Sequence, residues 1–483
     1  MTETIPHVVI IGGGISGLAT AYYLQKQAAA AGTAVTYTVA EQDSRLGGKI
    51  ASAQMDAFIV EGGPESFVTR KPEAYELCQE LGLQDRLVGT TSSGKNYVLQ
   101  GGKPAAVPMD PVSAIRTPLL SLRGKLRVLK EPFVAPRTNP SDETLGDFIR
   151  RRLGHEALDN LVAPAVGSIY LSDANKLSVQ VSFGRFAELE REYGSVIKGF
   201  FGMMKARRQE RKASDAPKPP KQAKRPAFMT LRGGLHEMVD ALVAELDGEV
   251  LTDTAVTQLR YNPTHSQPYE LLFSDGQTRR ATAVVLAVPT FAMADLLADH
   301  DPDLAAALRA VTYNAVATVT VAFNRADVPD PFDGFGVVVP EKEPSPLLAI
   351  EGMSNKFKHR NPADQFVLRA FVGGGRRQDL ISLPDDELIA LVRRELKTIF
   401  GIAAAPTLVR IFRWQPAIPQ YGVGHLQMID QAEAQLAQVL PGVYLTGSGT
   451  RGMGIPDCIR LARGTVSQLL QTVTQQAQLE IGD

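Results

Sequence analysis

The chain has 483 residues, of which 44% are hydrophobic and 21% charged, and its formal net charge at pH 7 is −1. This length exceeds what one hydrophobic core usually supports, so two or three domains are expected. The near-neutral charge gives no electrostatic reason to expect nucleic acid as a partner, and no apolar run reaches the roughly 18 residues that a membrane span needs. The first predicted strand begins almost at the N-terminus, so no signal peptide is expected, and the cytoplasm is the default location.

The first predicted element is a short apolar strand over residues 8–11, which runs into a glycine-rich turn and an alanine-rich helix. A strand, the spacing G-x-G-x-x-G and a helix in this order are typical of dinucleotide binding. Gly12 permits the tight turn, Gly14 lets the backbone approach a pyrophosphate, and Gly17 lets the helix pack closely on the strand. The pyrophosphate would lie at the helix N-terminus, where free N–H groups favour an anion.

A second predicted strand, residues 34–39, is followed by Glu41. This acidic residue lies close to the roughly 20-residue offset expected for the carboxylate that binds the ribose hydroxyls. Two further glycine-rich segments follow, residues 45–49 and 62–67. A nicotinamide dehydrogenase does not need a glycine pair at this place, so the dinucleotide is expected to be a different one.

Further pieces of the same domain are predicted far along the chain. Residues 228–260 have the pattern of a strand, a turn, a helix and a strand, and an apolar strand over 283–288 stops at Pro289. A returning strand over 443–446 leads to a helix from about Cys458. Residues 1–94, 228–290 and 438–483 are therefore predicted to form one dinucleotide-binding domain from discontinuous segments.

Two insertions separate these pieces. Residues 95–227 are predicted to form a helical domain that faces the substrate or a membrane, and residues 291–437 a β-rich substrate domain with a mixed sheet. The helical domain ends in a basic stretch, 205–226, predicted to be a flexible loop because it has almost no apolar residues; a tether to anionic lipid or to a partner is the alternative. The leucine- and cation-rich stretch 119–129 is expected either to cover the substrate pocket or to lie on a membrane surface.

Cysteine and histidine are too sparse for a metal site. The two cysteines, Cys78 and Cys458, are expected to be buried free thiols. The seven histidines are scattered without ligand spacing, so no bound metal is expected.

Longer motifs carry a family resemblance. They are Gly63 to Phe67 with Arg70 and Lys71, and residues 228–235, 354–374, 413–421 and 452–459, the last reading GMGIPDCI. With these motifs the chain resembles, over essentially its whole length, the FAD-dependent coproporphyrinogen III oxidase and protoporphyrinogen oxidase family of haem biosynthesis. That family belongs to the amine oxidase-like flavoprotein superfamily. The resemblance is greater to the soluble coproporphyrinogen III oxidases.

The resemblance implies an α/β plus α+β fold, with a Rossmann-like FAD-binding domain, a mixed-sheet substrate domain and a helical insertion. It implies dehydrogenation of a porphyrinogen, with hydride passing to FAD, O2 as the oxidant and hydrogen peroxide as a product. A ferrochelatase-type partner and peripheral contact with the inner face of the cell membrane remain open. Two other classes remain alternatives: an amine oxidase or carotenoid desaturase of the same fold, and a non-catalytic porphyrin-binding flavoprotein. The residues expected to bind FAD are Gly12, Gly13, Gly14, Ile15, Ser16, Gly17, Glu41, Gly48, Lys49, Gly63, Pro64, Glu65, Ser66, Val256, Trp414, Gly454, Ile455, Pro456 and Asp457.

The catalytic residues are expected to position a flat substrate rather than to supply a strong base. Lys71 follows the flavin-binding turn and is expected to contact substrate or flavin, while Tyr170 and Tyr421 are expected to form walls of the pocket. The family's Gly-Ile-Tyr-Ala-Gly-Asp is replaced here by residues 168–173, Ser-Ile-Tyr-Leu-Ser-Asp, which puts the pocket's shape and the preferred porphyrinogen in doubt. Arg451 also departs from the family pattern and is expected near the flavin.

Overall fold

The structure is a computed structural model that describes residues 5–91, 94–139, 141–213, 225–329 and 333–482. The chain forms two compact units. Unit 1 contains residues 1–89, 227–312 and 426–483, and unit 2 contains residues 90–226 and 313–425. The mixed α/β architecture agrees with the predicted fold class.

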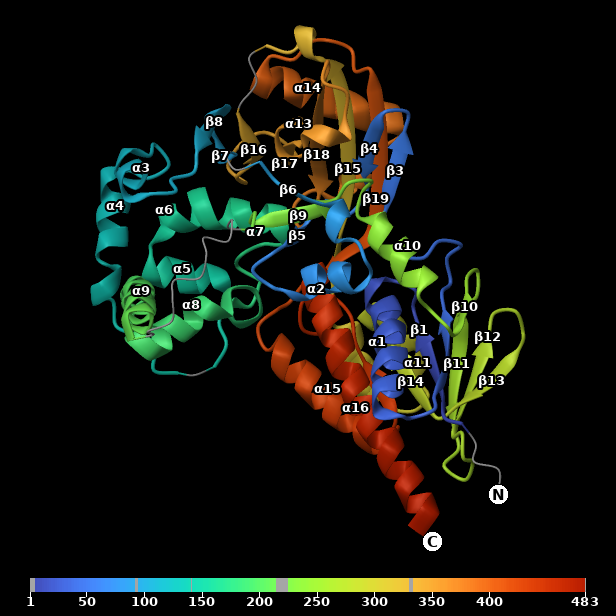
Figure 1. Cartoon of the computed structure of the whole chain (residues 1–483). Helices are drawn as coiled ribbons and strands as arrows, with labels where there is room; N and C mark the ends of the chain where they lie inside the picture. The colour runs from blue at the N-terminus through green and yellow to red at the C-terminus, as the bar shows by residue number, and fades with distance from the viewer. Residues whose placement is uncertain (1–4, 92–93, 140, 214–224, 330–332, 483) are drawn as a thin grey trace. The chain divides into compact units, whose positions relative to one another are not determined.

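Unit 1 is built on a five-stranded parallel sheet with the order β10-β2-β1-β14-β20. Figure 1 labels β10, β1 and β14 of this sheet. Side chains of β1 alternate between two hydrophobic cores, with Val8 and Ile10 in one and Val9 and Ile11 in the other. A parallel strand covered on both faces is apolar throughout, which explains why the sequence VVII forms the central strand. The strands are β1 (His7–Ile11), β2 (Thr36–Ala40), β10 (Glu249–Leu251), β14 (Ala283–Leu286) and β20 (Val443–Leu445).

Helices cover both faces of this sheet. One core contains residues of α1 (Ile15–Ala31), α2 (Glu73–Glu80), α10 (His236–Ala244) and α16 (Ile455–Gly482). The other contains residues of α11 (Thr290–Leu297), α12 (Pro302–Arg309) and α15 (His425–Val439). Unit 1 also has three small antiparallel sheets. The first pairs β3 (Ser52–Met55) with β4 (Phe58–Glu61), and in the second β9 (Phe228–Leu231) lies between β5 (Phe67–Val68) and β6 (Leu87–Gly89), which follows the short helix η1 (Gln84–Arg86). The third contains β11 (Val256–Tyr261), β12 (Tyr269–Phe273) and β13 (Thr278–Ala281).

Unit 2 contains a seven-stranded mixed sheet with the order β19-β15-β18-β17-β16-β7-β8. Only β16 and β7 pair in parallel in this sheet, as far as the described residues show. Its core includes Leu388, Val392 and Leu396 of helix α14 (Asp385–Phe400). The strands are β7 (Lys95–Gln100), β8 (Lys103–Ala106), β15 (Tyr313–Asn324), β16 (Gly334–Val338), β17 (Leu347–Gly352), β18 (Gln365–Gly373) and β19 (Leu408–Pro419).

The remaining helices of unit 2 are mostly short. They are α3 (Pro111–Arg116), α4 (Leu122–Leu129), η2 (Glu131–Phe133), α5 (Leu145–Arg152), α6 (His155–Ala157), the π-helical η3 (Leu158–Val162), α7 (Ala163–Ile169), α8 (Val179–Tyr193), α9 (Val196–Ala213), η4 (Arg325–Asp327), α13 (Met353–Lys356), η5 (Lys358–Arg360) and η6 (Gln378–Ser382). None of the described helices is long and apolar enough to cross a membrane.

The structure differs from the sequence-based expectations in three places. Residues 95–106, predicted to be part of the helical domain, form the hairpin β7–β8, because Gly101 and Gly102 both adopt the positive φ of a two-residue turn. Residues 205–213, predicted to be loop, are the last turns of α9, since Lys, Arg, Gln and Ala favour helix; residues 214–224 lie outside the described part. Helices α11 and α12, placed by the predicted boundaries in the β-rich domain, belong to unit 1.

Candidate functional site

The turn between β1 and α1 can be made only with glycine at two of its positions. Gly12 has φ +107°, and a Cβ there would lie 2.8 Å from the carbonyl oxygen of Ala287. A Cβ on Gly17 would overlap the carbonyl oxygen of Gly12. At Gly14, in contrast, the nearest atom to a Cβ would be Gly48 Cα at 3.9 Å. The space beside Gly14 is therefore unfilled by protein, as is required where the backbone approaches a ligand closely.

The two later glycine-rich segments lie against this turn. The N–H of Gly47 donates to the carbonyl oxygen of Gly13 at 2.8 Å, and Gly14 and Gly47 form an isolated parallel bridge. A Cβ on Gly63 would overlap the carbonyl oxygen of Lys49. The structure therefore brings together the segments around Gly12, Gly48 and Gly63, which sequence reasoning assigned to one site.

Glu41 closes the other side of the turn. Its carboxylate accepts hydrogen bonds from the N–H of Gly13 at 2.6 Å and of Asp43 at 3.0 Å, and the residue is 8% exposed. Its carbonyl oxygen accepts from the N–H of Thr254 at 2.8 Å, and this contact places Val256, the first residue of β11, close by in the chain. The carboxylate is thus fixed at the end of β2, where a ribose-binding acid is expected.

Lys49 is a cation without a counter-ion in this site. No carboxylate of the described residues pairs with it, and burial lowers the pKa of its ammonium. An unpaired, half-buried ammonium is costly, and a phosphate group would relieve that cost. The open Gly14, the N-terminus of α1 and Lys49 together fit the pyrophosphate of FAD.

Cys458 is a buried thiol that interacts with Ser16, one of the predicted FAD ligands. Burial raises the pKa of its thiol to about 11, although a hydrogen bond with Ser16 acts in the opposite direction. Cys458 and Cys78 are both buried and free, as predicted. At neutral pH the Cys458 thiol is protonated and hence a poor nucleophile.

Four predicted FAD ligands lie at the start of α16: Gly454 directly precedes the helix, and Ile455, Pro456 and Asp457 are in its first turn. Asp457 forms an ion pair with Lys71, whose ammonium lies 2.6 Å from each of the two carboxylate oxygens. The Lys71 side chain is 40% exposed and that of Asp457 is 13% exposed. The carboxylate of Asp457 thus orients the predicted catalytic lysine.

In unit 2 the two predicted pocket tyrosines lie near each other. The side-chain amide of Gln420, next to Tyr421, donates to the carbonyl oxygen of Tyr170 at 3.3 Å. The Tyr170 hydroxyl donates to the carbonyl oxygen of Ser182 at 3.1 Å. Tyr421 is only 1% exposed, and its ring centroid lies 4.7 Å from that of His425, so most of Tyr421 is packed inside unit 2.

The segment that departs from the family pattern is strained. Leu171 has φ +50°, a conformation that costs a residue with a side chain about 1 kcal/mol. Its carbonyl oxygen accepts a hydrogen bond from the side chain of Asn314, and its side chain packs in one apolar cluster with Trp414 and Ala417. Trp414, a predicted FAD ligand, lies in β19 of unit 2.

Arg451 does not offer a free positive charge. Its guanidinium forms ion pairs with Asp430, at 2.7 Å, and with Glu433, both on α15. These carboxylates hold the pKa of Arg451 above its usual value although burial acts in the opposite direction. These ion pairs thus attach the loop that precedes α16 to helix α15.

Sequence reasoning missed Arg376, which lies close to the Tyr170 segment. Its guanidinium donates to the carbonyl oxygen of Val339 at 2.5 Å, and lies 3.8 Å from the position that a Cβ on Gly167 would take. Burial lowers the pKa of Arg376 despite the opposing charge of Glu341. The sequence contained one signal for this region, because three consecutive glycines, Gly373 to Gly375, precede Arg376 and predict a turn.

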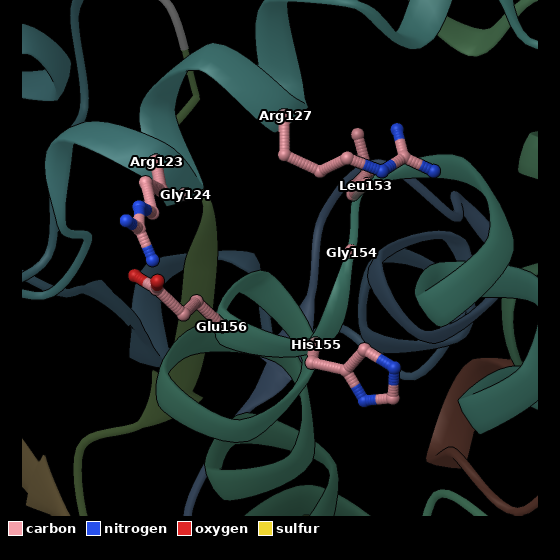
Figure 2. A pocket seen from close by; sticks show the side chains of 7 residues that line it. All are labelled: Arg123, Gly124, Arg127, Leu153, Gly154, His155 and Glu156. Carbon is pink, nitrogen blue, oxygen red and sulfur yellow. The ribbon is translucent and has the colours of Figure 1, made fainter.

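A small cavity in unit 2 is unrelated to the predicted residues. It has a volume of about 200 Å³ and lies between α4 and the Leu153–Glu156 turn (Figure 2). Arg127, on its wall, donates to the carbonyl oxygens of Arg152 at 3.0 Å and Arg151 at 2.5 Å. Its Glu156 carboxylate accepts hydrogen bonds from the backbone and hydroxyl of Ser121. These groups are already satisfied, so the cavity is part of the packing of α4.

The chain is similar to known flavoproteins over almost its whole length. The model of the family described as flavin containing amine oxidoreductase matches residues 15–470. The chain is 33% identical to a coproporphyrinogen III oxidase of Bacillus subtilis, over 97% of this chain and 99% of the relative, and 30% identical to the enzyme of that name from Staphylococcus aureus, over 96% and 98%. A crystal structure from Exiguobacterium sp. 255-15, provisionally assigned as a protoporphyrinogen oxidase, is similar with a TM-score of 0.82 and 29% identity, covering 96% of this chain and 99% of that one.

Proposed function

The chain belongs to the flavin-containing amine oxidoreductase family, and from this premise we propose that it is an oxygen-dependent FAD oxidase that converts coproporphyrinogen III to coproporphyrin III. The observation that carries the proposal is the near full-length similarity to coproporphyrinogen III oxidases at 30% identity or more. Protoporphyrinogen IX is the second candidate substrate, since protoporphyrinogen oxidases of Arabidopsis thaliana are 28% and 29% identical to the chain.

Unit 1 supplies the groups that would hold the cofactor. The N–H groups at the start of α1 and the ammonium of Lys49 bind phosphate, and Glu41 binds ribose hydroxyls. When bound, FAD supplies the hydride acceptor. Lys71, oriented by Asp457, donates hydrogen bonds to an electronegative atom of the flavin or the substrate.

Unit 2 supplies the groups that would hold the tetrapyrrole. The Tyr170 and Trp414 rings offer flat apolar surface. Arg376 offers a half-buried guanidinium in the same region, and burial strengthens its attraction to a carboxylate. We infer that Arg376 binds one of the propionates, of which coproporphyrinogen has four and protoporphyrinogen two.

The same proposal includes O2 as the electron acceptor and hydrogen peroxide as the second product. It also includes a ferrochelatase-type enzyme as the recipient of the porphyrin. The proposed location is the cytoplasm. The alternative enzymes, an amine oxidase or a carotenoid desaturase, would have the same fold. Solved structures of a putrescine oxidase and a cyclohexylamine oxidase resemble the chain with TM-scores of 0.68 and 0.69. Their sequence identities of 16% and 17% show similarity of fold alone.

The test is a comparison of initial rates with coproporphyrinogen III and protoporphyrinogen IX at one oxygen concentration, followed by porphyrin fluorescence and by peroxide release. We expect turnover of both, with the larger kcat/KM for coproporphyrinogen III. A purified yellow protein that raises fluorescence no faster than autoxidation would refute the proposal. Peroxide release with putrescine, or desaturation of phytoene, would support the alternative enzymes, while tight porphyrin binding without turnover would indicate a carrier.

A further inference from the structure

The side-chain amide of Asn314 joins two segments of unit 2. Asn314 is the second residue of β15, and its Nδ2 donates to the carbonyl oxygen of Leu171, while its Oδ1 accepts a hydrogen bond from Gln378 Nε2 at 3.1 Å. Because a carbonyl oxygen can only accept, the bond to Leu171 fixes which way the amide points. One end of the amide therefore holds the segment that contains Tyr170, and the other end holds the segment that contains Arg376.

The Tyr170 side of this junction is fixed by further contacts. The Tyr170 hydroxyl donates to the carbonyl oxygen of Ser182 at 3.1 Å, and the Tyr170 carbonyl oxygen accepts from the side chain of Gln420 at 3.3 Å. Leu171 is 3% exposed and packs in the apolar cluster that contains Trp414. None of these contacts involves the Asn314 amide, so this segment is the fixed reference for whatever the amide attaches to it.

The Arg376 side depends more strongly on Asn314. A Cβ on Gly375, the residue before Arg376, would lie 3.5 Å from Asn314 Nδ2 and 3.6 Å from the carbonyl oxygen of Leu171. On the other side of Arg376, Gln378 bonds to the same amide. Gly375 and Gln378 are both exposed, so neither is held by burial in the core. Contacts with Asn314 thus lie on both sides of Arg376 in the chain.

An irregularity in β15 brings Asn314 to this junction. The register of β15 against β19 shifts between Asn314 and Val316, and a β-bulge of this kind re-aims the side chains beside it. On the other edge of β15, the carbonyl oxygen of Ala315 accepts from the N–H of Gly374 at 2.8 Å. The backbone of β15 and the side chain of Asn314 therefore hold successive parts of the chain that carries Arg376.

We propose that Asn314 is a positioning residue, which holds the guanidinium of Arg376 at a set place relative to the Tyr170 ring. A porphyrinogen that lies against this ring then presents a propionate to Arg376 without either segment having to reorder, and a preorganised site of this kind binds more tightly. Asn314 acts through Arg376 and needs no contact with the substrate itself. The inference deepens the proposed function and rests on it, because it takes a propionate to be the ligand of Arg376.

The test is steady-state kinetics of the FAD-loaded variants with coproporphyrinogen III. Asn314→Ala should raise KM by about five- to tenfold, the value of one hydrogen bond, because the substrate must then order the Arg376 segment as it binds. The change in kcat should be smaller. Gln378→Leu breaks only the weaker, exposed bond and should raise KM by about two- to fivefold.

A double-variant cycle separates positioning from a general structural role. In the Arg376→Met background, Asn314→Ala should change KM by less than about twofold, because the group that it positions is already gone. Asn324→Ala is the matched control and should leave KM unchanged. Asn324 lies at the other end of β15, and its amide also bonds to two side chains, Asp327 at 3.1 Å and Gln365 at 3.0 Å.

Flavin absorbance and the thermal midpoint of each variant show whether it is folded. If Asn314→Ala does not fold, Gln378→Leu, at an exposed position, and its combination with Arg376→Met carry the same test. An active wild-type enzyme whose KM is unchanged in these variants would overturn this inference alone. The same factor in KM with and without Arg376 would assign Asn314 a purely structural role and would overturn it as well. A wild-type protein without turnover would refute the proposed function, and this inference with it.

Discussion

The ammonium of Lys71 lies 2.6 Å from both carboxylate oxygens of Asp457 and thereby joins the chain that follows residues 63–66 to the first turn of α16. Two of the motifs that carry the family resemblance meet in this ion pair. If Asp457 acts by orienting Lys71, the two side chains form one functional unit.

We expect Asp457→Asn and Lys71→Met each to lower kcat/KM for coproporphyrinogen III by roughly ten- to a hundredfold, the value of one charge-assisted hydrogen bond. The double variant should lose no more than the worse single variant, because each substitution already breaks the unit. The thermal midpoint should change little, since a pair of this exposure contributes at most about 1 kcal/mol. Additive losses in the double variant would show that the two residues act separately.

Lys49→Met should weaken FAD binding by roughly ten- to a hundredfold, since it removes a charged hydrogen-bond donor to phosphate. Burial lowers the pKa of Lys49 in the free protein, and a bound phosphate raises it. FAD affinity should therefore be highest below the pKa of the free protein, and should fall as the pH rises above it. Titration of apoprotein with FAD at several pH values measures both effects.

The matched control for Lys49→Met is Lys26→Met. Lys26 also lies in unit 1, but its ammonium is paired with Glu80 at the surface. If both substitutions weakened FAD binding equally, the role of Lys49 in phosphate binding would be refuted.

Gly14→Val should give a folded but colourless protein. A Cβ at Gly14 has no neighbour closer than 3.9 Å, so the fold tolerates a side chain, while the space for a pyrophosphate is lost. Gly464→Ala, at another unit 1 glycine with nothing within 4 Å, is the control and should keep its flavin. Absorbance near the flavin bands and the thermal midpoint of each apoprotein measure the difference. A yellow Gly14→Val protein with full activity would contradict the assigned site.

Arg376→Met should raise KM for coproporphyrinogen III by roughly ten- to a hundredfold with a smaller change in kcat, because a propionate bound equally in ground and transition states contributes to KM. Arg377→Met is the control, since Arg377 is exposed and paired with Asp379. Steady-state kinetics with both porphyrinogens measure the effect. Equal KM values for the two variants would remove Arg376 from the substrate site.

Glu131→Gln should destabilise the helical part of unit 2 by about 1.5–3 kcal/mol, because the fully buried Arg152 loses one of its two carboxylate partners and keeps only Glu190, at 3.3 Å. Burial alone would raise the pKa of Glu131, but hydrogen bonds from Ser195, Arg152 and the start of α9 outweigh it and hold the pKa below 4.5. This stabilisation is complete above that value and is lost as the pH falls through the pKa of the folded protein. The wild-type thermal midpoint should therefore fall in acid more steeply than that of the variant.

Glu188→Gln provides the comparison for Glu131→Gln, because it breaks the exposed pair with Arg185 and should cost under about 1 kcal/mol. Thermal unfolding between neutral and acid pH separates the two cases. Similar midpoints for the two variants would mean that the buried pair does not stabilise unit 2.

The parts of the fold that follow local rules could be predicted from the sequence. The β1–α1 turn was predicted because Gly12 and Gly17 are required by backbone geometry. The mixed sheet within residues 291–437 was predicted because this segment contains long apolar stretches, which form β15 and β18. The contact between the segments around Gly14 and Gly48 could also be expected, since both are glycine-rich and the sequence assigns both to one ligand.

Features that depend on tertiary contacts could not be predicted. The hairpin β7–β8 joins a sheet whose other strands lie more than 200 residues away in sequence, so its membership depends on a distant partner. The ion pair of Arg451 with Asp430 and the position of Arg376 beside Gly167 likewise arise from folding. Arg451 became a candidate for the flavin because it departs from the family pattern, while the glycine run before Arg376 marks a turn there but does not give the position of its side chain.

The order of strands in unit 1 has a consequence for how the protein is made. His7, at the start of β1, bonds to Thr282, 275 residues later, and β20 is added only when residue 445 has been synthesised. The ribosome must therefore release the chain beyond residue 445 before the five-stranded sheet can close. Products that end before β20 lack the last strand of the sheet that supports the β1–α1 turn, and we therefore expect them to retain little flavin.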